Sequence, residues 1–191
     1  MTAAQITVTT WHLEQTAPGD VRPPASPAPE AEFVRAELIG PEFARFLYTA
    51  VGGDWNWTDR LPWSYREWAD WLARPGLETW VAWVRGTPAG YVQLEPHPEG
   101  EVEIAYFGLI PAFHGRGLGG HLLTHGLRRA WDLADRHPGL PATRRVTVHT
   151  CSLDGPAALR NYESRGFRLF RTETAEQPAA TTPGPWENSR P

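Results

Sequence analysis

The chain has 191 residues, of which 41% are hydrophobic and 21% are charged, a balance that is ordinary for one globular domain with a sizeable core. The net charge of −4 argues against a general nucleic-acid-binding surface, and the single cysteine excludes an intrachain disulfide and a cysteine-based zinc cluster. No apolar run of about 18 residues is present, and no basic segment leads into an apolar one at the N-terminus, so we expect a cytoplasmic protein that does not span a membrane.

The first third of the chain alternates short elements with loops. Residues 5–12 alternate in polarity as a strand does, and Pro41 and Ser64 each stand where a helix can begin. The predicted elements are a strand at 5–12, a proline-rich loop at 17–31, a strand at 32–38, and helices at 41–51 and 64–76.

The rest of the chain predicts a sheet with one crossover. Strands are predicted at 78–84, 89–95, 101–109 and 144–151. A helix lies between the last two, so we expect those two strands to pair in parallel. The final elements are a short helix from Pro156 to near Gly166, a strand at 167–174, and a poorly ordered tail at 175–191. We therefore expect one domain at 1–174.

Residues 110–120, IPAFHGRGLGG, form a glycine-dense loop that leads into an amphipathic helix. Gly115, Gly117, Gly119 and Gly120 leave the backbone bare where that helix begins. The first amides of a helix have no intrahelical partner, and the helix dipole adds positive potential there. The loop therefore predicts a site for a phosphate-bearing ligand.

A dinucleotide is one candidate ligand, because Gly115, Gly117 and Gly120 satisfy the pattern G-x-G-x-x-G. The surrounding sequence does not fit that ligand. Residues 110–114 separate the strand from the first glycine, and no acidic residue stands at 139–141, about 20 positions further on, to bind a ribose. A dinucleotide-dependent oxidoreductase is therefore the weaker alternative.

Two motifs together resemble the GCN5-related N-acetyltransferase (GNAT) family. Residues 114–119, HGRGLG, resemble its pyrophosphate loop, and residues 157–167, AALRNYESRGF, resemble its motif A-x-x-L-Y-x-x-x-G-F. The chain departs from the family at His114, where the family has Arg or Gln, at Asn161 in place of Leu, and at Gly155, where Asn is common. The resemblance implies an α/β fold, with a mixed, mostly antiparallel central sheet, a splayed parallel strand pair and flanking helices.

The resemblance also implies that acetyl-CoA is the co-substrate. We expect no metal, because the seven histidines show no metal-binding spacing such as H-E-x-x-H. Its pantetheine arm would lie where the parallel strands separate, and backbone N–H groups near Leu109 and Ile110 would hold the oxyanion. Its pyrophosphate would bind the amides of the glycine loop. The predicted binding residues are Leu109, Ile110, His114, Gly115, Arg116, Gly117, Leu118, Gly119 and Gly120.

Tyr162 and Glu103 are the candidate catalytic residues. Tyr162 holds the tyrosine position of the family motif, and a phenol, with its pKa of about 10, stays protonated at neutral pH and can donate to a CoA thiolate. Glu103 lies in the strand 101–109, where the resemblance implies a general base. Its apolar neighbours Val102 and Ile104 lead us to expect a raised pKa. A chain of water molecules is the alternative route for the proton.

The segment 52–63, GGDWNWTDRLPW, reads as an aromatic loop between two helices. Trp55 and Trp57 are candidate acceptor-site residues, and Arg60 or Asp59 could select a charged substrate. The alternative is that the tryptophans only cover the core.

These observations predict an enzyme that moves an acetyl group from acetyl-CoA to a primary amine of a small molecule or peptide, by direct attack. A non-catalytic acyl-CoA-binding sensor or structural module of the same fold is the alternative. A homodimer fits the resemblance. Cys151 reads as a small buried residue more than as a nucleophile, and His149 either faces the opening between the strands or is structural.

Overall fold

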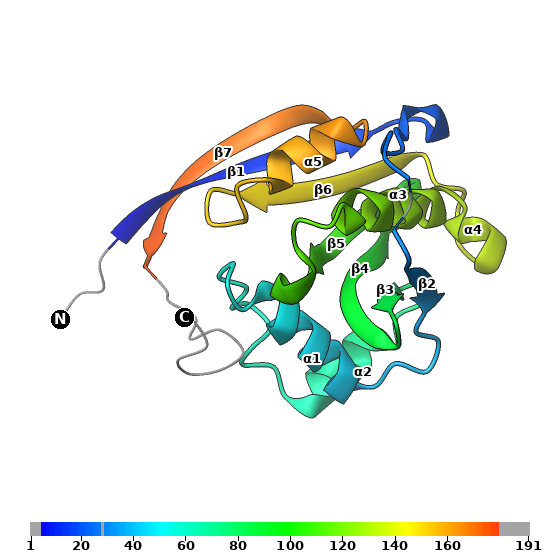
Figure 1. The fold of residues 1–191 in the computed structure, drawn as a ribbon, viewed down its shortest axis with the longest axis horizontal. Helices are drawn as coiled ribbons and strands as arrows, with labels where there is room; N and C mark the ends of the chain where they lie inside the picture. Colours follow the sequence, from blue (N-terminus) through cyan, green and yellow to red (C-terminus); the bar gives the residue numbers. More distant parts are fainter. Residues whose placement is uncertain (1–4, 28, 180–191) are drawn as a thin grey trace.

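A computed structural model describes residues 5–27 and 29–179 of the chain. Its centre is a seven-stranded sheet in the order β2-β3-β4-β5-β6-β1-β7 (Figure 1). All neighbouring strands are antiparallel except β5 and β6, which are parallel. The strands are β1 Gln5–Gln15, β2 Glu32–Arg35, β3 Glu78–Val84, β4 Thr87–His97, β5 Glu101–Leu109, β6 Arg145–Cys151 and β7 Arg168–Pro178. The predicted fold class is confirmed.

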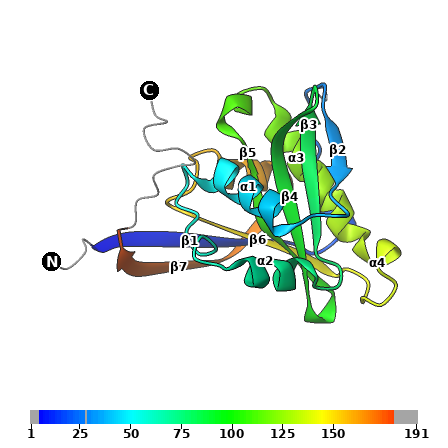
Figure 2. The same ribbon diagram turned by 90° about the horizontal axis from the view of Figure 1, so that it is seen from below.

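Helices cover both faces of the centre of the sheet. The helices are α1 Pro41–Gly52, α2 Tyr65–Leu72, α3 Leu118–Trp131, α4 Leu133–Arg136 and α5 Ala158–Ser164, with short 3-10 turns at Pro18–Asp20, Pro98–Gly100 and Pro111–Phe113. Figure 2 shows α1 and α3 on opposite sides of β4. Residues 89–95 of β4 are accordingly buried without alternation, as expected for a strand that packs on both faces.

The parallel pair β5–β6 separates soon after it begins. Its register joins Glu101 to Arg145 and Glu103 to Thr147, and the remaining residues of β5 have no partner in β6. The predicted crossover through α3 and the predicted open end of the two strands are therefore confirmed. In an open α/β sheet, such a separation of adjacent strands is where a ligand can enter.

Several predicted boundaries differ from the observed ones. β1 continues to Gln15 and lies between β6 and β7, and β7 continues to Pro178, where it pairs with Gln5. Because that pairing orders the backbone, the prediction of a poorly ordered tail from residue 175 is wrong for 175–178; residues 180–191 lie outside the described part of the chain. Figures 1 and 2 show β1 and β7 extending side by side away from the other elements.

Two other elements are shorter than predicted. β2 ends at Arg35 because the chain turns there, and the N–H of Glu37 donates to the carbonyl of Arg35. α2 ends at Leu72, before Pro75, which disfavours helical backbone in the residue that precedes it. Ser64 caps this helix as predicted, and its hydroxyl accepts a hydrogen bond from the N–H of Glu67.

Candidate active site

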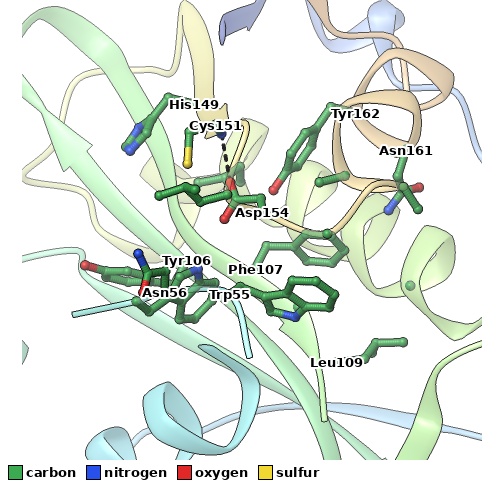
Figure 3. A pocket seen from close by; sticks show the side chains of 18 of the residues that line it. Trp55, Asn56, Tyr106, Phe107, Leu109, His149, Cys151, Asp154, Asn161 and Tyr162 are labelled. Atoms are coloured by element: carbon green, nitrogen blue, oxygen red, sulfur yellow. Dashed lines mark hydrogen bonds between the residues drawn. The ribbon is translucent and has the colours of Figure 1, made fainter. Parts of the chain in front are cut away.

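A cavity of about 1190 Å³ lies at the open end of β5 and β6 (Figure 3). Its walls come from β5, the start of α3, the segment between β6 and α5, α5 itself and the aromatic loop 52–63. The cavity therefore brings together predicted residues from the glycine loop, the two candidate catalytic residues and the aromatic loop, which are separate in the sequence. The predicted residues that line it are Trp55, Trp57, Arg60, Glu103, Leu109, His114, Gly115, Gly117, Leu118, Gly119 and Tyr162.

The glycine loop is shaped by two left-handed residues. Gly115 has a φ of 72° and Gly117, the residue that precedes α3, has a φ of 74°, a region that side chains other than glycine rarely adopt. The His114 ring ties the loop to the sheet, since its Nε2 lies 3.0 Å from the carbonyl oxygen of Leu109. The bare N-terminus of α3 therefore faces the cavity and suits an anionic group.

Three of the predicted binding residues do not line this cavity. The Ile110 N–H donates to the carbonyl of Ala89 at 2.9 Å, so it is not free, and the prediction that it holds an oxyanion is wrong. Hydrogen-bonding groups alternate between the two sides of a strand, so those of Leu109 face the open side instead. The side chain of Arg116 lies over the ring of Phe113, with Cζ 5.5 Å from its centroid.

Gly120, the third, is covered by an arginine that sequence reasoning missed. A Cβ atom at Gly120 would lie 2.8 Å from Nη1 of Arg165, which follows α5 and lines the cavity. Among the described residues, the buried Nε of Arg165 has no hydrogen-bond partner, and desolvation lowers the pKa of this guanidinium. An incompletely paired cation beside the positive end of α3 is costly without an anion, so these groups fit a phosphate-bearing ligand.

Tyr162 projects from α5 and is almost completely buried, with 6% of its surface exposed. Its ring packs edge-on against Phe107 and Phe167, with centroids 5.9 and 5.8 Å away. Figure 3 shows its hydroxyl directed toward the interior of the cavity. Burial, and then the negative charge of Asp154, raise the pKa of this phenol well above its ordinary value, so it stays protonated.

Glu103 is held between two histidines. Its Oε1 lies 3.0 Å from Nδ1 of His149, and its Oε2 lies 2.9 Å from Nε2 of His97. The hydrogen bond with His149, which outweighs desolvation, lowers the pKa of this carboxyl, so the prediction of a raised pKa is wrong. The apolar neighbours Val102 and Ile104 point to the opposite face of β5, where they cannot desolvate Glu103.

A further carboxylate, Asp154, lies just after β6 and was not predicted. Its Oδ2 accepts hydrogen bonds from the hydroxyl of Thr150 at 2.6 Å and from the N–H of Cys151 at 2.9 Å. Only a short turn-forming segment, S-L-D-G-P, marked this stretch in the sequence. Burial raises the pKa of the Cys151 thiol, which favours the protonated form and agrees with the expectation that Cys151 is not a nucleophile.

The side chains of the aromatic loop divide between the cavity and a packed cluster, and some of them belong to both. The Trp55 ring lies against His114, with centroids 6.3 Å apart, and 3.4 Å from the position of a Cβ atom at Gly155. Trp57 packs on Tyr48 and Tyr106, with centroids 5.5 and 5.0 Å away. Trp57 therefore serves the core as well as the cavity, and Trp55 is the more available of the two.

Arg60 is held by its neighbours. Its Cζ lies 4.1 Å from the ring centroid of Trp63 and 4.0 Å from that of Trp71, and its Nε donates to the Tyr106 hydroxyl at 2.8 Å. That hydroxyl donates in turn to Asp59 at 2.7 Å. Arg60 lines the cavity, but these contacts show a residue that orders the loop, which sequence reasoning did not anticipate.

Among the described residues, no group of three or more His, Cys, Asp or Glu side chains is arranged to hold a metal ion. No helix in the same part of the chain is long and apolar enough to cross a membrane.

A splayed parallel pair with a glycine-rich helix terminus at its mouth defines an α/β domain with a site suited to a phosphate-bearing ligand. Comparison with known proteins makes that class specific. A family model, the acetyltransferase (GNAT) family, matches residues 41–167. The chain belongs to this family, and the resemblance inferred from its two motifs is confirmed.

Individual relatives agree with this assignment. The chain is 34% identical over 154 residues to a mycothiol acetyltransferase of Mycobacterium marinum, a match that covers 76% of the chain and 47% of that protein. The chain thus spans about half the length of the curated relatives it matches. Solved structures of GCN5-related N-acetyltransferases from Kribbella flavida and Sphaerobacter thermophilus share its fold. Their TM-scores are 0.62 and 0.60, each at 18% identity, and the matches cover 90% and 93% of this chain and 58% and 53% of those chains.

Proposed function

We propose that this protein transfers an acetyl group from acetyl-CoA to a primary amine of a small molecule or peptide. One observation carries the proposal. A single cavity joins the bare N-terminus of α3 to the protonated hydroxyl of Tyr162 and to the Glu103–His149 pair. Those are an anion site, a proton donor and a proton acceptor, the groups that acyl transfer between a thioester and an ammonium requires.

The chain offers acetyl-CoA two kinds of contact. The amides of residues 115–119, together with the guanidinium of Arg165, would hold the pyrophosphate. The N–H of Leu109, which faces the open side of β5, would meet the pantetheine arm or the oxyanion of the tetrahedral intermediate. When bound, acetyl-CoA supplies an activated acyl group, and the chain supplies its position and the proton transfers.

The reaction needs three proton movements. The ammonium group of the acceptor loses a proton toward Glu103, and the free amine then forms a C–N bond at the thioester carbonyl. The nitrogen of the tetrahedral intermediate next loses its second proton to solvent. As the C–S bond breaks, the Tyr162 hydroxyl donates its proton to the departing sulfur, and solvent restores that proton later. The raised pKa of Tyr162 supports this role, because the phenol stays protonated at neutral pH.

The walls of the cavity favour a cationic acceptor. Asp59, Glu103 and Asp154 all line it, and so does the half-buried ring of Trp55. Carboxylates around an aromatic wall attract an ammonium group and exclude an anion. Because the curated relatives are named as mycothiol acetyltransferases, amines related to mycothiol come first among the acceptors to test.

The test combines binding with turnover. Acetyl-CoA should raise the melting temperature and NAD(H) should not, because a ligand stabilises the state that binds it. A panel of mycothiol-related amines, amino sugars, amino acids and peptides should then contain one acceptor that releases free CoA. Stabilisation by NAD(H) alone would overturn the proposal. Stabilisation by acetyl-CoA with no CoA release from any amine would favour the non-catalytic acyl-CoA-binding module.

A further inference from the structure

Three side chains from neighbouring strands form a continuous hydrogen-bonded chain, and two of them, Glu103 and His149, line the cavity. His97 ends β4, Glu103 lies in β5 and His149 lies in β6. Each histidine takes one oxygen of the carboxylate, at 2.9 Å for His97 and 3.0 Å for His149. Both carboxylate oxygens are therefore engaged, and an acceptor reaching Glu103 directly would compete with these two rings.

His149 is the member of this chain that faces solvent. Its side chain is 54% exposed and lines the cavity, whereas that of Glu103 is 24% exposed. Figure 3 shows the His149 ring on the same wall as Cys151 and Asp154. Within the described residues, its Nε2 makes no hydrogen bond, so this nitrogen is free to meet a substrate.

The contact with Glu103 fixes which nitrogen of His149 can accept a proton. An ionised carboxylate only accepts hydrogen bonds, so Nδ1 must carry the hydrogen that points to Glu103. In the neutral ring, Nε2 then holds the lone pair and faces the cavity. This arrangement, an imidazole oriented by a carboxylate behind it, is the one that makes histidine an effective general base.

We propose that His149 is the residue that takes the proton from the acceptor ammonium, and that Glu103 is its positioning residue. The N–H bond of the ammonium breaks, Nε2 of His149 gains the proton, and the amine keeps the electron pair with which it attacks. The resulting imidazolium is stabilised by the charge of Glu103. This inference rests on the proposed acetyl transfer and replaces direct proton uptake by the carboxylate.

The charges around His149 support this role. Glu103 faces it from β5, Asp154 from the segment after β6, and Asp59 from the loop between α1 and α2. The His12 ring on β1 lies 5.9 Å away, and its Nε2 is 2.9 Å from the Glu173 carboxylate on β7. The hydrogen bond with Glu103 outweighs desolvation and raises the pKa of His149, so the neutral, accepting form dominates only above its ordinary value of about 6.5.

The pH dependence of kcat/KM shows whether His149 or Glu103 is the base. The wild-type rate should rise with pH along a limb that titrates above about 6.5. His149→Gln should remove that limb and lower the rate by about 10²–10⁴. Glu103→Gln should keep the limb but move it to lower pH, because the group that raises the histidine pKa is gone. Repeating the profile with a second acceptor of different pKa identifies any limb that belongs to the amine.

An NMR titration of the His149 ring tests the pair without turnover. The ring should titrate above about 6.5 in the wild type and lower in Glu103→Gln. The matched control is His12→Gln, which removes the histidine whose ring lies 5.9 Å from that of His149. This variant should keep the same limb in the pH profile of kcat/KM.

Two outcomes would overturn the inference: loss of the limb in Glu103→Gln with its retention in His149→Gln, or a His149 pKa that does not respond to Glu103→Gln. Neither depends on the outcome that would overturn acetyl transfer itself, which is the absence of CoA release with every amine.

Discussion

The ring of Tyr162 on α5 meets the ring of Phe107 on β5 edge-on, at 5.9 Å between centroids and an interplanar angle of 62°. This contact spans the open end of the parallel strands, since Phe107 lies beyond the last residue of β5 that pairs with β6. It packs α5 against the sheet and fixes the direction in which the Tyr162 hydroxyl points. The packing of the ring and the chemistry of the hydroxyl can therefore be separated by substitution.

Tyr162→Phe should retain the fold and the binding of acetyl-CoA but lose turnover. The substitution removes only the hydroxyl, so the contacts with Phe107 and Phe167 remain. Loss of a general acid costs about 10²–10⁴ in kcat. Tyr65→Phe, at an exposed position of α2, is the control and should match the wild type. Equal kcat values for Tyr162→Phe and wild type at saturating acceptor would assign Tyr162 to packing alone.

Gly119→Asp should abolish the rise in melting temperature that acetyl-CoA causes. A Cβ atom at Gly119 would lie 3.7 Å from Leu109 and 3.9 Å from Asn161, ordinary contact distances, so the variant should fold. Its carboxylate would stand where the start of α3 receives a phosphate, and like charges repel there. Gly139→Asp, at an exposed glycine with no atom near its Cβ position, should keep the full shift. A full shift in Gly119→Asp would place the phosphates elsewhere.

Arg60→Met should destabilise the protein by about 1–3 kcal/mol, because it removes the cation between two tryptophans and the hydrogen bond to Tyr106. Urea unfolding measures the change. The KM for the acceptor should rise while that for acetyl-CoA stays constant. Arg66→Met, at a side chain 90% exposed on α2, controls for loss of an arginine. If Arg60→Met left stability unchanged but altered the preference of the enzyme among acceptors, Arg60 would instead be a substrate ligand.

Glu78, the first residue of β3, links stability to pH. Its side chain is fully buried and lies 2.8 Å from Arg136, 3.2 Å from Arg35 and 2.9 Å from His137. Burial alone would raise the pKa of this carboxyl, but hydrogen bonds from Arg136, Trp80 and His137 outweigh burial and lower it.

The pKa of Glu78 is lower in the folded state than in the unfolded state. Its ionised carboxylate therefore stabilises the fold fully above the unfolded-state pKa of about 4.3, and this stabilisation is lost as the pH falls through the folded-state pKa. Glu78→Gln should cost about 3–5 kcal/mol at neutral pH, since it leaves buried arginine charge uncompensated. Denaturation at several pH values should show that the difference in unfolding free energy between Glu78→Gln and wild type becomes smaller below about pH 4. A difference that stays constant at acidic pH would exclude this linkage.

The sequence predicted the features that depend on interactions between residues close together in the chain. The glycines at 115 and 117 predicted a bare backbone where α3 begins, and Ser64 predicted the start of α2. Alternating apolar residues and a helix-length connection predicted the parallel pair β5–β6. The extent of β7 was missed because its last residues, AEQP at 175–178, have little strand propensity and pair with β1 at the far end of the sheet.

The surroundings of the site residues were decided by tertiary structure. The pKa of Glu103 follows from His149, 46 residues away in the chain, and not from its apolar neighbours. The Ile110 amide is occupied by Ala89, and the N-terminus of α3 gains the guanidinium of Arg165. Backbone preferences are local, so sequence reveals them. Electrostatics and hydrogen bonding depend on which groups strand register and helix packing bring within a few ångströms, and only the folded chain sets those distances.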